Sequence, residues 1–183
     1  MNFNIENVIE ILGEFNPIIQ QIRENRCSFG EAEQKVKKIV QNVGQIMMET
    51  LSQNISECEY PSSVVDDDGV VYQYVKQSTK SMKTIFGNTI SIKRAYYYNR
   101  EHHKSYIPLD RALKIEGLKE LSPLLDYFTC YLSGQLPYEK SHNCLLELLG
   151  VNISTSCVQK NAEAIGESVS ELDLIPSALQ SDC

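Results

Sequence analysis

The sequence predicts a mainly helical α+β protein with an N-terminal helical hairpin, a small central β-hairpin unit and a C-terminal helix-turn-helix. Three observations lead to this fold class. Apolar residues recur at helical spacing before residue 58, alternate as in strands from Val70, and return to helical spacing after Gly117. At 183 residues the chain is long enough for one or two compact domains.

Residues 1–58 are predicted to form the helical hairpin. Apolar side chains recur at helical spacing from Asn4 to Arg23, and Pro17 is expected to kink or break that run. A second helix is expected to begin at Ser28, because Ser28 and Glu31 have the spacing of a capping box. It should continue for about 28 residues, or about 40 Å at 1.5 Å per residue.

This second helix carries an apolar seam with alternating steps of four and three residues. Its members are Val36, Val40, Val43, Met47 and Thr50 or Leu51. Such a seam needs a partner, which is either the preceding helix in a hairpin or a second copy in a homo-oligomer. The apolar helix that directly precedes it favours the hairpin.

The central region is predicted to contain the strands. Residues 59–75 are expected to be a linker followed by a first strand, and residues 76–116 a basic β-hairpin unit. Three segments have strand character, namely Val70–Val75, Met82–Phe86 and Thr89–Tyr98. Gly87-Asn88 predicts a two-residue turn between the last two.

Positive charge is concentrated in the same region, although the net charge of the chain is −7. From Lys76 to Lys104 there are seven Lys or Arg residues and one acid, Glu101. Such a segment either binds phosphates or balances the acidic helices on either side of it. Along the strand from Thr89 the basic residues interleave with tyrosines, a combination suited to phosphates and bases. The alternative, favoured for at least half of those tyrosines, is that they pack on neighbouring helices. Lys83, Lys93 and Arg94 are the candidate phosphate contacts.

Residues 117–172 are predicted to be helical and to include a helix-turn-helix over Pro137–Gly166. Gly150 suits the end of its first helix and Ser154 the N-cap of its second. The helical period predicts core positions in these helices, and Val151 and Ile153 are expected to fill the corner between the last two. The positions on the helices are Leu124, Leu125, Phe128, Leu132, Leu145, Leu148, Leu149, Val158, Ala162 and Ile165.

Four polar positions then remain on the first two turns of the second helix. They are Thr155, Ser156, Gln159 and Lys160. Side chains of these types reach base edges and phosphates in a major groove, so they are the candidate DNA-reading residues. The alternative is that the two helices merely close a helical core. From Gly117 to Cys183 there are three Lys or Arg and nine Asp or Glu, which on average repel DNA.

Several classes of function are excluded or unsupported. No stretch of 18 apolar residues and no basic leader is present, so we expect a cytoplasmic protein without a membrane partner. The six cysteines are scattered, which predicts buried thiols rather than zinc sites or disulfides. Asp66–Asp68 and His102-His103 lack a further ligand cluster, so we expect no metal. No nucleophile and base can be paired, and we expect no catalytic residue.

Five segments occur in an order that resembles a known family. They are Thr84–Arg94, Tyr96–Tyr98, Pro108–Asp110, Leu121–Pro123 and Gly150–Gly166. Together they resemble the N-terminal half of bacterial insertion-sequence transposases of the Kra type and the related Lre type. The resemblance implies a helical N-terminus, a small β unit and a helix-turn-helix that binds the ends of the element. It also implies a following ribonuclease-H-like domain with three metal-binding carboxylates.

The chain departs from that pattern in two places. Members of the Kra type often have a cysteine pair after the tyrosines, where this chain has Asn99, His102 and His103, so no zinc site is carried over. The catalytic domain and its Mg²⁺ would lie beyond Cys183, after a tail over residues 173–183. The expectation is a DNA-binding transposase fragment that has no cofactor and is not an enzyme as it stands. The alternative is a helical dimerisation or interaction module that binds no nucleic acid.

Overall fold

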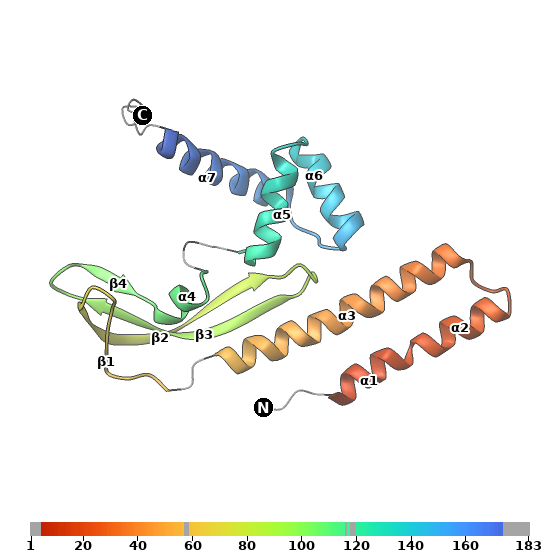
Figure 1. Cartoon of the computed structure of the whole chain (residues 1–183), viewed down its shortest axis with the longest axis horizontal. Helices are drawn as coiled ribbons and strands as arrows, with labels where there is room; N and C mark the ends of the chain where they lie inside the picture. The colour runs from red at the N-terminus through yellow and green to blue at the C-terminus, as the bar shows by residue number, and fades with distance from the viewer. Residues whose placement is uncertain (1–4, 57–58, 116, 118–119, 174–183) are drawn as a thin grey trace, which may run out of the picture. The chain divides into compact units, whose positions relative to one another are not determined.

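A computed structural model describes residues 5–56, 59–115, 117 and 120–173 (Figure 1). The described chain is of the predicted α+β class, with helices on either side of a four-stranded antiparallel sheet in the sequence. It forms two compact units, Met1–Ser122 and Pro123–Cys183. Residues 174–183 of the predicted tail, including Cys183, lie outside the described residues, and so does Cys58.

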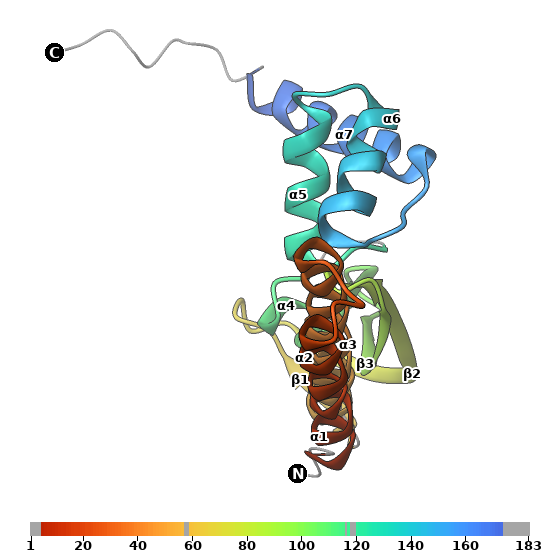
Figure 2. The same ribbon diagram turned by 90° about the vertical axis from the view of Figure 1, so that its right-hand side faces the viewer.

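The first unit begins with the predicted helical hairpin, in which two short helices pack along one long helix, seen from the side in Figure 1 and nearly end-on in Figure 2. The short helices are α1 (Ile5–Gly13) and α2 (Phe15–Arg23), and the break between them precedes Pro17 by three residues. The long helix α3 (Phe29–Ile55) begins after Ser28, whose backbone N–H donates to Glu31 at 2.7 Å in a complete capping box. Ile18, Cys27, Ala32 and Ile39 form the buried contact.

The sheet consists of β1 (Ser63–Val65), β2 (Val71–Lys83), β3 (Thr89–Asn99) and β4 (Lys104–Tyr106), in that order. The predicted two-residue turn is wrong, because a five-residue loop from Thr84 to Asn88 joins β2 to β3. Asn88 accepts a backbone hydrogen bond from Thr84 N–H at 2.8 Å, and Gly87 N–H donates to Thr84 O at 3.0 Å. Gly87 has φ +87°, which a β-branched residue would strain to reach.

A β-bulge lets one long hairpin bury different faces at its two ends. The pairing of β2 with β3 shifts between Tyr74 and Lys76, so one extra residue reverses the alternation along β2. Near the loop, one face is buried in a cluster of Met82, Ile90, Ile92 and Ile115. Beyond the bulge, the opposite face is buried in a cluster of Tyr72, Ala95 and Tyr97. The sheet therefore supports two cores.

The loop of the hairpin is fixed to α3 by reciprocal hydrogen bonds. Gln45 Nε2 donates to the carbonyl of Phe86 at 2.7 Å, and Asn88 Nδ2 donates to the carbonyl of Gln45 at 3.1 Å. The ring of Phe86 lies directly over Gly44, where an added Cβ would be 2.3 Å from the ring. Only a residue without a side chain allows this approach.

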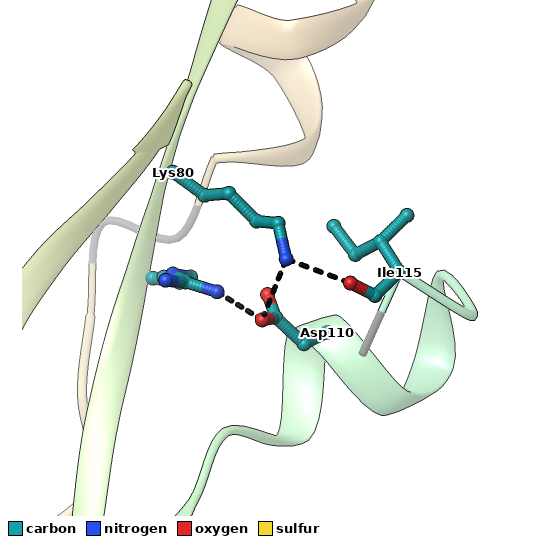
Figure 3. Close-up of polar contacts among 4 residues, drawn as sticks. Lys80, Asp110 and Ile115 are labelled. Atoms are coloured by element: carbon teal, nitrogen blue, oxygen red, sulfur yellow. Dashed lines mark hydrogen bonds and ion pairs between the residues drawn. The ribbon is translucent and has the colours of Figure 1, made fainter. Parts of the chain in front are cut away.

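A buried ion cluster fixes α4 (Pro108–Ala112) to the sheet (Figure 3). Asp110 of α4 contacts the guanidinium of Arg94 and lies 3.5 Å from Lys80 Nζ. Lys80 also donates to the carbonyl of Ile115 at 2.7 Å. The side chains of Lys80, Arg94 and Asp110 are 9%, 14% and 7% exposed. Charges removed from water to this degree require close partners.

The second unit contains α5 (Pro123–Ser133), α6 (Tyr138–Cys144), the π-helical turn η1 (Leu145–Leu149) and α7 (Thr155–Asp173). Helix α5 packs on α7, where Asn161 Nδ2 donates to Asp126 Oδ1 at 2.5 Å. Burial raises the pKa of Cys130 in this contact to about 11, with a further contribution from Asp126, so Cys130 is a thiol at neutral pH.

Two predicted core positions of this unit are wrong. Leu124 is 51% exposed, because Leu125 and Thr129 take the buried face of α5 and Leu124 lies about 100° away around the helix. Leu148 is 67% exposed, because η1 has π-helical hydrogen bonding and the wider turn rotates its side chains out of the α-helical register. The side chain of Ile165 lies outside the described residues.

Replacing Gly44 by Ala should destabilise the first unit by about 1–3 kcal/mol, because the ring of Phe86 must move to admit the methyl group. Gly30→Ala is the matched control, since it lies in the same helix and an added Cβ there meets nothing within 4 Å. It should leave stability unchanged or raise it. Urea unfolding followed by circular dichroism measures both, and equal effects would contradict the close contact.

Replacing Asp110 by Ala should lower the free energy of unfolding by about 3–5 kcal/mol, because Lys80 and Arg94 would stay buried without a counter-ion. Asp67→Ala is the control. Asp67 also pairs with an arginine, Arg111 at 2.8 Å, but on the surface with a side chain that is 79% exposed. That pair is screened by water, so its loss should have a much smaller effect in the same urea titration.

Candidate nucleic-acid interface

The turn of the predicted helix-turn-helix forms as expected in the second unit. Gly150 ends η1 in the left-handed conformation with φ +68°. Ser154 then caps α7, because its Oγ accepts from Cys157 N–H at 3.2 Å. Val151, Ile153 and Val158 are buried beneath the turn. These contacts fix the start of α7.

The four candidate DNA-reading residues are all exposed on the first two turns of α7. Gln159 Nε2 donates to Glu163 Oε1 at 2.7 Å, and Ser156 Oγ lies 3.0 Å from Ser154 Oγ. Thr155 and Lys160 are also exposed. Buried Val158 lies between these positions, so the helix presents its polar side outward. Side chains of these types can donate to and accept from base edges.

Lys83 and Lys93 share the uncovered face of the sheet next to the loop of the hairpin. We call this the hydroxyl-lysine face; it consists of Gln77, Thr79, Ser81, Lys83, Thr89, Ser91 and Lys93. Apart from half-buried Lys83, its members are exposed, and no acidic residue is among them. The backbone of Lys83 is fixed by bonds to Glu120 and Ser122. Lysine, serine, threonine and glutamine are typical contacts of DNA phosphates.

Arg94 lies on the opposite face and points into the protein. Its guanidinium contacts Asp110, so its charge already has a partner within the fold. We therefore remove Arg94 from the candidate phosphate contacts. Lys80, which also adds to the basic character of the segment, is buried in the same cluster. Counting charges along the sequence missed this because Asp110 is 16 residues from Arg94 and meets it only in the folded chain.

Other candidate sites do not assemble among the described residues. No group of three His, Cys, Asp or Glu side chains could hold a metal there. Asp66 closes its loop by accepting from the backbone N–H of Val70 at 2.9 Å, which lowers the pKa of Asp66. His102 and His103 are exposed. Of the described cysteines, Cys27 is buried whereas Cys130, Cys144 and Cys157 are partly exposed.

No helix in the described part of the chain has the length and apolar character of a membrane span. Comparison with curated proteins found no match, and neither did comparison with solved structures. One family model, described as an uncharacterised protein family (UPF0236), matches residues 22–173. That match begins in α2 and extends to the end of α7, so it includes the sheet, the ion cluster and the helix-turn-helix. The chain belongs to the UPF0236 family.

Proposed function

We propose that this chain is a DNA-binding part of an insertion-sequence transposase and recognises the ends of its element. Helix α7 would read bases with Thr155, Ser156, Gln159 and Lys160. The hydroxyl-lysine face would bind phosphates with Lys83 and Lys93. We propose no catalytic step, metal or cofactor for these residues.

The observation that carries the proposal is the arrangement at the start of α7. A left-handed glycine, a serine cap and a buried Val151, Ile153 and Val158 position two turns of exposed polar side chains. A recognition helix requires this combination of a rigid start and an uncovered polar side. The ordered segments that resemble insertion-sequence transposases supply the reason to choose DNA over another ligand.

Charge explains why a second surface belongs in the proposal. The sequence after Gly117 has three times as many acidic as basic residues, so α7 alone would approach DNA against an average repulsion. The hydroxyl-lysine face has two lysines and no acid. Phosphate contacts supply most of the sequence-independent affinity of DNA-binding proteins. We therefore assign affinity to the sheet and specificity to the helix.

Replacing Gln159 and Lys160 by Ala should remove sequence preference. The cognate duplex is first obtained by selection from a random-sequence DNA library with the wild-type chain. A lost bidentate base contact should then cost about 1–3 kcal/mol on that duplex and little on a scrambled one. Fluorescence anisotropy titrations measure both affinities.

The matched control is Gln34→Ala with Lys38→Ala, which removes the same residue types from exposed positions of α3. It should keep the wild-type ratio of the two affinities. If the wild type selects no sequence, or if the α7 variant keeps the ratio, the proposal fails. A chain without any DNA affinity would instead favour the interaction-module alternative.

Replacing Lys83 and Lys93 by Ala should weaken binding to all duplexes alike. The slope of log K against log salt should become shallower by about 0.9 for each phosphate contact that is lost. Lys38→Ala with Lys114→Ala is the control, because both lysines are exposed and lie outside the hydroxyl-lysine face. An unchanged slope in the Lys83 and Lys93 variant would exclude this face as the phosphate-binding surface.

A further inference from the structure

The helical hairpin leaves a stripe of large apolar side chains uncovered on α3. Val40, Met47 and Leu51 are all exposed by about half or more. At 100° per residue they lie within an arc of about 40°. This is the seam expected from the sequence, and α1 and α2 cover only the flank beside it that contains Ala32 and Ile39. The hairpin therefore covers one flank of the seam, the ring of Phe86 covers Gly44 on the other, and the stripe between them stays exposed.

Helix α2 continues the uncovered surface. Phe15 and Ile22 are exposed and are rotated about 60° and 40° from buried Ile18. On α3, Val40 and Met47 are rotated about 100° and 80° from buried Ile39, in the same sense. Helices α2 and α3 run antiparallel. In such a pair, residues that are rotated in the same sense away from the contact between the helices lie on the same side of the pair. The two stripes thus form one surface.

We call this surface the open face; it consists of Phe15, Ile22, Phe29, Val40, Met47 and Leu51, which are 40–76% exposed. Six large side chains at this exposure present on the order of 500 Å² of apolar surface. A stable interface buries about 800 Å² on each partner, of which about 60% is apolar. The open face therefore matches one side of a stable protein interface in size.

The two ends of the hairpin have opposite charge. At the closed end, where α2 connects to α3, residues 23–38 contain five Lys or Arg and three Glu. At the open end, residues 5–14 contain three Glu, residues 39–56 contain one Glu, and neither segment has a Lys or Arg. A partner that places its own closed end against this open end would gain favourable charge pairs at both ends.

We propose that the open face binds the open face of a second copy of this chain, in head-to-tail orientation. The two-fold axis lies in the plane of contact and is perpendicular to the helices. It places the α3 helices of the two copies against each other in opposite directions. Two-fold symmetry of this kind is the commonest in homodimers. Val40 lies eleven residues from both Phe29 and Leu51, so an axis at Val40 brings Phe29 to Leu51 of the other copy. The inference does not depend on DNA binding.

Sedimentation equilibrium of the full chain tests the dimer. We expect dimers at about 50 μM protein, and Val40→Asp with Met47→Asp should weaken association at least 100-fold, because each of the two chains would bury two charges in an apolar contact. The control, Gln34→Asp with Gln53→Asp, adds the same charges to exposed positions of α3 outside the open face. It should associate like the wild type. A monomeric wild type, or equal association of both variants, would overturn the proposal.

Cross-linking tests the orientation. An equimolar mixture of Phe29→Cys and Leu51→Cys chains, treated with a short thiol-to-thiol linker, should give a heterodimer band. A mixture of Phe29→Cys and Ile22→Cys chains should give no such band. Both positions lie at the closed end of the hairpin, so they would meet only if the closed ends of the two copies lay side by side. The wild type gives the background from its own cysteines. A band in the second mixture and none in the first would overturn the head-to-tail arrangement.

Discussion

The buried carboxylate of Asp110 is the interaction on which the first unit depends. It is the counter-ion that Lys80 of β2 and Arg94 of β3 share, and so it requires α4 and both strands to meet at one place. Removing three charged groups from water is costly unless all three are close together, so a shift of either strand would be unfavourable. The cluster thus determines which face of the sheet is covered and leaves the hydroxyl-lysine face open.

The bulge between Tyr74 and Lys76 makes this arrangement compatible with a second core. Without it, the strict alternation of a strand would place Tyr72 on the same face as Met82. With it, one hairpin buries Met82 on one face and Tyr72 on the other. Two of the segments singled out in the sequence, Thr84–Arg94 and Pro108–Asp110, have clear structural roles in this unit. Thr84 and Asn88 close the loop, and Arg94 and Asp110 form the ion pair.

The proposed functions use surfaces that folding leaves unoccupied. The start of α7, the hydroxyl-lysine face and the open face of the hairpin are each next to a buried cluster that fixes their geometry. A head-to-tail dimer would carry two copies of α7, which is what repeated DNA half-sites require. Base reading, phosphate binding and self-association would then be separate properties of one chain and could be altered separately by mutation.

The sequence by itself determined the features that depend on near neighbours. The capping box at Ser28, the left-handed end at Gly150 and the cap at Ser154 are local, so composition and spacing were sufficient to predict them. Only the tertiary structure decided where Arg94 points, how far the hairpin loop extends and which part of the α3 seam stays open. Each of these depends on residues distant in the chain, such as Asp110, Gln45 and Ile18. Periodicity identifies an apolar or charged side chain, but long-range packing selects its partner.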